Sequence, residues 1–396
     1  MSNFPLDHRP LLRGLNCTFR RYLYDRISWG QRTVGVIGQE GAGKTTLLLQ
    51  RIKLQFGESE KACYLSLDNL GFLRRTLTRT VTEFCKNGGT HLFLDQVQAY
   101  PAWLKECGLL LNKYPDLHLV FAASPVIRPE EVETKFGKDT TCYRLHTLSF
   151  REYLAYESVL DKAPIPLDEL VSHHAGWVKE INSQLHIVPL FRNYLSHGCY
   201  PFYWHDPTAF PERLQRNVAK SIEVDLASAA TLTQGGILRM KKLLMETVTT
   251  SPLLLRSAEL TRQTGLPYGQ QASYLDYLQQ LGYLRVRNIP CASGSDAEGK
   301  QVFAGNPNLQ TWLSEKATDR RLLAQTFFLD QLSAVADVQL VEKQDFRVND
   351  RYTFRVGDPL QDYESIKNKE NTFAAVYGLP RSVLNRMPIW LLGFCY

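Results

Sequence analysis

The feature that most constrains this chain is the segment GQEGAGKTT at residues 38–46. It follows TVGVIG (33–38), an apolar run with strand composition, and it leads into KTTLLLQRIKLQF (44–56), a run with helix composition. The spacing fits G-x-x-x-x-G-K-[ST], in which glycines let successive backbone N–H groups turn toward phosphate oxygens and the next helix presents its positive amino end. This order predicts a phosphate-binding loop within an α/β fold.

The loop supplies most of the candidate ligand-binding residues. They are Gly38, Gln39, Glu40, Gly41, Ala42, Gly43, Lys44, Thr45 and Thr46. Lys44 would reach the β- and γ-phosphates, and the hydroxyl of Thr45 would bind Mg²⁺. A second magnesium anchor is expected at the end of a neighbouring strand, where Asp95 closes the apolar run of residues 90–96. An ordinary strand-ending aspartate is the alternative, and the presence of the loop favours the metal-binding interpretation.

The nucleotide is expected to be ATP. A GTPase needs an N-K-x-D stretch to recognise guanine, and NKYPD at residues 112–116 has one residue too many. The expected ligands are therefore ATP and Mg²⁺.

Further apolar runs resemble strands at residues 62–69, 90–96 and 117–124, with helical segments between them. Near-continuous apolar strands that alternate with helices indicate a parallel sheet covered on both faces. Residues 160–235 are expected to be mostly helical, and Gly235 and Gly236 to break the chain before a three-helix pattern that starts at residue 237. The last part mixes a helix with strands, as a small α/β domain does.

The length of 396 residues predicts two to three domains, and the net charge of +6 permits contact with nucleic acid without arguing for it. Eight scattered cysteines without a C-x-x-C pair are typical of reduced thiols in a cytosol. The histidines and cysteines of residues 173–205 lack zinc-site spacing. The start of the chain lacks the apolar core of a signal peptide, and no stretch approaches the roughly 18 apolar residues of a membrane span. A cytoplasmic protein with no membrane partner is expected.

Several segments together resemble a known family. They are the phosphate loop, YLSLDN, LFLDQVQAYPAW, LVFAAS, HTLSFREYL, LSHGCYPFYW and RMPIWLLGFCY. The chain resembles bacterial AAA-type P-loop ATPases of the STAND group (MNS clade). The resemblance implies an ATPase core (1–158), a helical lid (159–236), a winged helix (237–290) and a restriction-endonuclease-like domain (291–396).

The resemblance also implies roles for three catalytic positions. Gln96 lies where the family usually has the glutamate that activates water, and an amide cannot accept a proton from water. Ser124 falls at the strand tip that senses the γ-phosphate, and Lys138 falls where an arginine often reaches a neighbouring nucleotide. Asp68 and Glu40 remain alternative bases. ATP binding with slow turnover is expected.

The C-terminal modules are expected to lack strong DNA chemistry. The third helix of the winged helix (268–284) would expose Gln270, Gln271, Ser273, Asp276 and Gln279, none of which is basic. A packing module is therefore favoured over a DNA reader. In the nuclease-like domain, Asp345 stands at the first acidic position, but Arg355 replaces a metal-binding carboxylate and the lysine position near Gly357–Pro359 is empty. The nuclease fold is expected to be inactive.

The leading interpretation is an ATP-binding switch that acts on a protein partner or through self-assembly. The alternatives are an ATPase that binds duplex DNA through the winged helix and nuclease-like domain, and a binding scaffold in which the nucleotide is a structural ligand.

Overall fold

The computed structural model of the chain describes residues 8–289, 299–314, 319–342, 345–359, 363–367 and 369–396. Its Cα packing divides into two compact units, residues 1–147 with 223–231 and residues 148–222 with 232–396. The four domains expected from the sequence remain a prediction, and Cys291 and the predicted boundary at 290–291 lie outside the described residues. No helix in the described part of the chain is both long and apolar enough to cross a membrane.

The first unit is built on a five-stranded parallel sheet with the order β2-β3-β4-β1-β5. Its strands are β1 (Thr33–Gly38), β2 (Ala62–Ser66), β3 (His91–Asp95), β4 (His118–Ala123) and β5 (Thr140–Leu145). The first four confirm the strands predicted from apolar runs. The fifth was missed because it is an edge strand with mixed burial, so its sequence, TTCYRL, contains no long apolar run.

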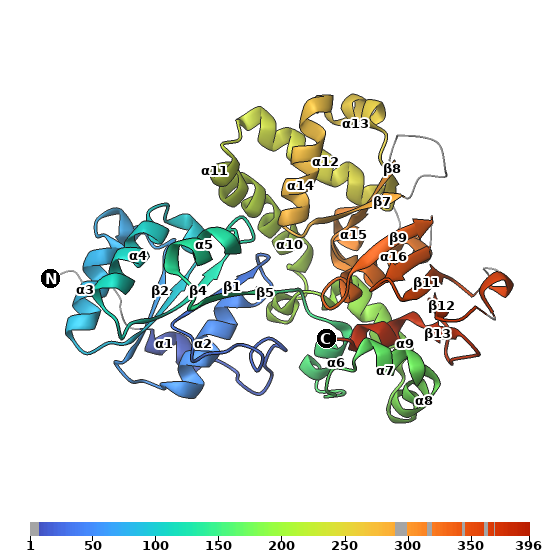
Figure 1. Cartoon of the computed structure of the whole chain (residues 1–396), viewed down its shortest axis with the longest axis horizontal. Coiled ribbons are helices and arrows are strands. Elements are labelled where there is room, and N and C mark those ends of the chain that lie inside the picture. Colours follow the sequence, from blue (N-terminus) through green and yellow to red (C-terminus); the bar gives the residue numbers. More distant parts are fainter. Residues whose placement is uncertain (1–7, 290–298, 315–318, 343–344, 360–362, 368) are drawn as a thin grey trace. The chain divides into compact units, whose positions relative to one another are not determined.

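Helices cover both faces of this sheet (Figure 1). They are α1 (Arg9–Arg13), α2 (Lys44–Gln55), α3 (Leu77–Lys86), α4 (Trp103–Lys113) and α5 (Pro129–Phe136). Alternate residues of β3 enter different cores. Leu92 and Leu94 pack with α3, α4 and α5, whereas Phe93 packs with α2. Burial on both faces explains why the strands are apolar without interruption.

The second unit begins with α6 (Phe150–Tyr156), which has a capping box between Ser149 and Glu152. Ser149 Oγ and Arg151 Nε both donate hydrogen bonds to a backbone oxygen of Tyr396, at 2.9 and 2.7 Å. LSFREYL and PIWLLGFCY, two of the segments that carry the family resemblance, are therefore in direct contact, and the second forms a 3₁₀ helix at Ile389–Phe394.

Residues 160–235 are largely helical, as predicted. The α-helices are α7 (Leu167–Ser172), α8 (His174–Gln184), α9 (Ile187–Asn193), α10 (Phe210–Lys220) and α11 (Ala227–Ala230), with π-helical turns at Tyr194–Gly198 and Ser221–Leu226 and a 3₁₀ helix at Pro201–His205. In the aromatic segment of residues 200–204, Tyr200 and Phe202 are buried and Trp204 stacks on Tyr156 at 4.1 Å between ring centroids. This segment is core rather than an exposed stacking surface.

Three helices and a small antiparallel sheet follow. They are α12 (Gln234–Thr249), α13 (Ser257–Thr264) and α14 (Tyr268–Gln280), with β6 (Leu253–Leu254), β7 (Leu284–Ile289) and β8 (Gly299–Ala304) in the order β6-β8-β7. The chain break predicted at Gly235 and Gly236 is wrong, because both glycines lie inside the first turn of α12. The side chain of Thr233 caps that turn by accepting a hydrogen bond from Gly236 N.

The C-terminal part has a five-stranded mixed sheet with the order β13-β12-β11-β10-β9. Its strands are β9 (Val338–Glu342), β10 (Asp345–Val348), β11 (Tyr352–Gly357), β12 (Thr372–Val376) and β13 (Arg386–Pro388), and α15 (Pro307–Leu313) and α16 (Arg320–Leu332) precede them. The pairs β9–β10 and β10–β11 are antiparallel, whereas β11–β12 and β12–β13 are parallel.

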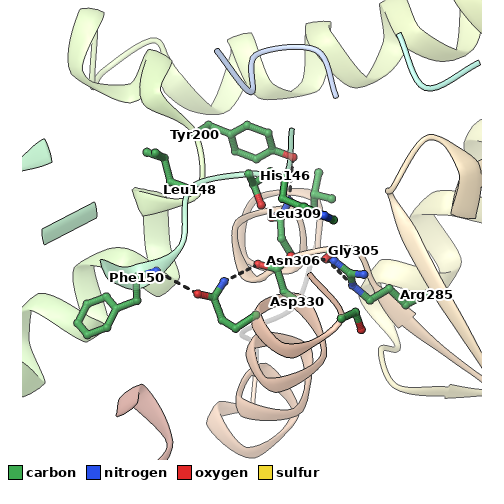
Figure 2. A network of polar contacts seen from close by, with 12 residues as sticks. His146, Leu148, Phe150, Tyr200, Arg285, Gly305, Asn306, Leu309 and Asp330 are labelled. Carbon is green, nitrogen blue, oxygen red and sulfur yellow. Dashed lines mark hydrogen bonds and ion pairs between the residues drawn. The ribbon is translucent and has the colours of Figure 1, made fainter. Parts of the chain in front are cut away.

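A buried ion pair joins β7 to α16 (Figure 2). The guanidinium of Arg285 donates to Asp330 Oδ1 at 2.9 Å and to the carbonyl oxygen of Gly305 at 3.1 Å. The side chain of Asp330 is 3% exposed. Burial raises the pKa of this carboxyl to about 6, although the charge of Arg285 acts in the opposite direction.

Candidate functional site

The phosphate loop connects β1 to α2 as the sequence predicts. Gly41 and Gly43 have φ angles of +81° and +99°, in the left-handed region that disfavours residues with a Cβ atom. Gly43 is the residue that precedes the first turn of α2, a helix of 12 residues. The backbone N–H groups of the loop therefore lie next to the positive amino end of α2. This arrangement suits the binding of an anion such as phosphate.

Lys44, the first residue of α2, folds back over the loop. Its ammonium group donates hydrogen bonds to the carbonyl oxygens of Gly38 and Gln39, at 2.8 and 2.9 Å. The residue is only 5% exposed. Its positive charge is thus held directly above the loop that would receive the phosphates.

Thr45 and Asp95 meet although 50 residues separate them. Thr45 Oγ1 donates to Asp95 Oδ2 at 2.5 Å, and the hydroxyl of Tyr64 donates to the same oxygen at 2.8 Å. The other oxygen, Oδ1, accepts from the backbone N–H of Gln96 at 2.8 Å. Burial, followed by the charge of Asp95, raises the pKa of Tyr64, so this hydroxyl stays protonated and remains a donor.

This arrangement fits a magnesium ion. Mg²⁺ prefers oxygen ligands and usually takes one or two from the protein, with water and phosphate oxygens for the rest. Thr45 and Asp95 offer a hydroxyl and a buried carboxylate, and no basic side chain in the described part of the chain donates a hydrogen bond to that carboxylate. The sequence analysis did not identify Tyr64 as a site residue. The signal that could have identified it was a polar hydroxyl within the apolar strand β2, next to β3.

Gln96 belongs to a chain of hydrogen bonds that connects β4 to the phosphate loop. The backbone N–H of Ser124 donates to Gln98 Oε1 at 3.1 Å, and Gln98 Nε2 donates to Gln96 Oε1 at 2.7 Å. Gln96 Nε2 then donates to Glu40 Oε2 at 3.4 Å. Gln98 was not predicted as a site residue, and the polar pair flanking Val97 in QVQ was the signal for it.

Ser124 lies one residue beyond β4, and Ala123 pairs with Ile37 at the end of β1. Ser124 therefore lies at the same sheet edge as the phosphate loop. Its Oγ is buried and has no hydrogen-bond partner among the described residues. A buried hydroxyl without a partner calls for an explanation, and a phosphate oxygen would supply the missing acceptor.

Lys138 is the one predicted site residue that lies elsewhere. It is exposed and precedes β5 by two residues, and Thr140 at the start of β5 pairs with Thr33 at the start of β1. The phosphate loop follows the opposite end of β1, about 17 Å away at the usual strand rise. Lys138 therefore lies away from the phosphates that this loop would bind.

In the second unit, Asp345 is neutralised by Arg355. The two residues are directly opposite each other on β10 and β11. The guanidinium binds both carboxylate oxygens, with Nε to Oδ1 at 2.8 Å and Nη2 to Oδ2 at 2.7 Å. The arginine that stands in place of a metal-binding carboxylate is therefore bonded to the aspartate of the neighbouring strand.

The exposed face expected for α14 needs one correction. Gln271 is buried, and its Nε2 donates to the carbonyl oxygen of Ser257 and to Thr261 Oγ1, both at 2.9 Å. The amide lies inward because α13 offers it acceptors, which residue polarity alone does not reveal. Gln270, Ser273, Asp276 and Gln279 are exposed as predicted.

One comparison with known protein families covers most of the first unit and the first residues of the second. A family model described as an AAA domain matches residues 30–154, which include the phosphate loop, Asp95 and Ser124. Residues 30–154 form an AAA-type ATPase-like domain. The strand order of its five-stranded parallel sheet, β2-β3-β4-β1-β5, is typical of P-loop AAA cores. No curated protein matches the chain in sequence.

Among solved structures, AMPPCP-bound DnaA from Aquifex aeolicus aligns with 14% identity over 65% of this chain and 84% of that chain, at a TM-score of 0.30. PCH-2 from C. elegans aligns with 12% identity over 37% and 48%, at 0.23. The S. cerevisiae Hsp104–ADP complex aligns with 15% identity over 63% and 36%, at 0.27.

Proposed function

We propose that this chain is an ATP-binding switch of the AAA/STAND type that hydrolyses ATP slowly. The observation that carries the proposal is the hydrogen bond from Thr45 Oγ1 to Asp95 Oδ2 at 2.5 Å. It lies beside a glycine-rich loop whose backbone is contacted by the ammonium group of Lys44. These groups match the needs of a nucleotide with magnesium: a positive charge and backbone N–H groups for the phosphates, and two oxygens for the ion. Bound magnesium would neutralise phosphate charge.

Slow turnover follows from the residue after Asp95. Gln96 can hydrogen-bond a water molecule, but its amide cannot accept a proton. A positioned general base is worth roughly 10²–10⁴-fold in rate. Since a median enzyme turns over at roughly 10 per second, a site without a proton acceptor at residue 96 should run at about 0.1 per second or below.

The second unit is proposed to transmit the nucleotide state to a partner. In this proposal residues 159–236 act as a lid, residues 237–290 as a winged helix and residues 291–396 as an inactive nuclease-like fold. The order of helices α12, α13 and α14 with the sheet β6-β8-β7 supports the winged helix. The arginine on Asp345 supports the inactive fold, because a cation at a ligand position repels a metal. Exposed Lys138 is proposed to reach the nucleotide of a neighbouring copy.

The deciding experiment is nucleotide binding by calorimetry. Wild-type protein should bind ATP with Mg²⁺, and Lys44→Ala should lose binding, because the loop loses its lysine beside the phosphates. Lys61→Ala is the matched control, since it removes one exposed lysine of the same unit outside the loop and should bind ATP as the wild type does.

Two results would contradict the proposal. One is the absence of ATP binding by folded wild-type protein. The other is an unchanged affinity in folded Lys44→Ala. Wild-type turnover well above one per second would leave ATP binding intact but disprove the slow switch.

A further inference from the structure

The phosphate loop carries a carboxylate, Glu40, next to Gln96, the residue that stands where the family usually has a glutamate. Glu40 is the third residue of the loop and is half-buried. Its Oε2 accepts a hydrogen bond from Gln96 Nε2 at 3.4 Å. The negative group missing from residue 96 is therefore present on the adjoining side chain.

The amide orientations along this chain of contacts are determined by its two ends. At one end, the backbone N–H of Ser124 can only donate, so Gln98 must present its carbonyl oxygen there and its NH₂ group to Gln96. At the other end, the carboxylate of Glu40 can only accept, so Gln96 must present its NH₂ group to it. Both amides are thus held with their donors directed toward Glu40.

The other candidate base lies farther from the loop in the strand order. Asp68 follows β2, is exposed, and accepts a hydrogen bond from Ser66 Oγ at 2.5 Å. Two strands, β3 and β4, lie between β2 and β1, the strand that leads into the phosphate loop. Glu40 is in the loop itself, so geometry favours Glu40.

We propose that Glu40 is the catalytic base of the slow ATPase, and that Gln96 and Gln98 are positioning residues that hold its carboxylate. The inference rests on the proposed function, since it concerns how ATP bound at this loop is hydrolysed. The proton acceptor then lies on the phosphate loop, at Glu40, instead of at residue 96.

The step balances in atoms and charge. As a water oxygen forms a bond to the γ-phosphorus, one water proton moves to a carboxylate oxygen of Glu40. The bond from the γ-phosphorus to the bridging oxygen breaks, and ADP leaves with the electron pair. The Glu40 carboxylic acid then releases its proton to phosphate or solvent, which restores the carboxylate.

Glu40→Gln tests the base directly, because it keeps the shape of the side chain and removes its ability to accept a proton. Single-turnover cleavage of γ-labelled ATP should slow by roughly 10²-fold. ATP affinity, measured separately by calorimetry, should stay the same or tighten, since a negative charge near the phosphates is gone. Glu60→Gln, an exposed glutamate of the same unit, should change neither quantity.

Gln98→Met tests the positioning role. It keeps much of the side-chain volume and removes both amide contacts, so turnover should fall by roughly threefold to tenfold while ATP affinity stays constant. Gln55→Met, at the exposed end of α2, is its control. Equal losses of affinity and turnover would indicate a merely structural glutamine.

A swap of the two side chains completes the test. Gln96→Glu alone should gain little, because its carboxylate would face Glu40, whereas Glu40→Gln with Gln96→Glu should recover wild-type turnover or more. Glu40→Gln that binds ATP and cleaves it within twofold of wild type would overturn the inference, as would loss of ATP binding in that variant. Failure of wild-type protein to bind ATP would instead remove the proposed function.

Discussion

Two aspartates of this chain each lie at one end of an interior strand but have different hydrogen-bond partners. Asp95 ends β3 and accepts hydrogen bonds from two hydroxyls and a backbone N–H. Asp345 begins β10 and is held by both sides of one guanidinium. Hydroxyls fix the position of a carboxylate and leave its charge available to a cation, whereas a guanidinium neutralises it. The partner, rather than the fold, decides which aspartate can bind a metal.

The strongest test of this comparison is to remove the charge of Asp95. Asp95→Asn keeps an oxygen for Thr45 and Tyr64 but no longer attracts a divalent ion. A metal ion supplies several kcal/mol of transition-state stabilisation, so turnover should fall below detection. Mg²⁺ should no longer raise ATP affinity in calorimetry with and without chelator.

Asp345→Asn serves as the matched variant in the second unit. It should leave ATP affinity and its dependence on Mg²⁺ unchanged, because Asp345 is already paired with arginine. If Asp345→Asn, rather than Asp95→Asn, removed the effect of Mg²⁺, the two aspartates would have been assigned the wrong roles.

Asp330 extends the comparison to a fully buried carboxylate with an arginine partner. Its folded pKa of about 6 lies above the ordinary value of 3.8, so its contribution to stability is complete below pH 3.8 and is lost as pH rises through 6. The loss should be about 2 kcal/mol between pH 4 and pH 7. Urea unfolding at both pH values measures this loss. The change in the free energy of unfolding between pH 4 and pH 7 is compared between wild type and Asp330→Asn.

Asp276→Asn, an exposed aspartate on α14, is the control for that measurement. Its pH profile should parallel that of the wild type. A profile of Asp330→Asn that also parallels the wild type would mean that the Arg285 charge outweighs burial and that the pKa of Asp330 is not raised.

A smaller effect is expected when the arginine on Asp345 is removed. The side chains of Arg355 and Asp345 are 21% and 14% exposed, so Arg355→Ala leaves a mostly buried carboxylate without its partner. Breaking a fully buried pair costs roughly 3–5 kcal/mol, and this pair should cost about 2 kcal/mol in the free energy of unfolding. Denaturant unfolding measures the loss.

Arg347→Ala is its control, since Arg347 is exposed on β10, the strand paired with that of Arg355, and should change stability by less than about 0.5 kcal/mol. Adding Asp345→Ala to Arg355→Ala should recover part of the loss. An Arg355→Ala protein as stable as the wild type would show that the ion pair contributes nothing.

No effect on DNA is expected from the nuclease-like part of the chain beyond weak binding. Purified protein with Mg²⁺ or Mn²⁺ should not cut plasmid, linear duplex or single-stranded DNA, because one neutralised carboxylate cannot hold a catalytic ion. Duplex binding should be weak and steeply salt-dependent, since the exposed face of α14 carries no basic residue. Metal-dependent cutting that disappears in Asp345→Ala would make the second unit a nuclease.

Much of the first unit follows from local sequence. Four apolar runs gave the strands β1 to β4, because strands buried on both faces must be apolar at every position. The phosphate loop was equally clear, since Gly41 and Gly43 are needed for its backbone angles. Edge strand β5 was missed because partial burial relaxes that demand.

The sequence by itself determined the loop, the lysine and threonine that follow it, the aspartate of β3 and the amide after that aspartate. All of these are set by residue type and by short-range spacing. Only the tertiary structure decided that Tyr64 shares an oxygen of Asp95, that Gln271 is buried and that Gln98 connects Ser124 to Gln96. Those relations depend on the register of neighbouring strands and on helix packing, which bring together side chains that no spacing along the chain relates.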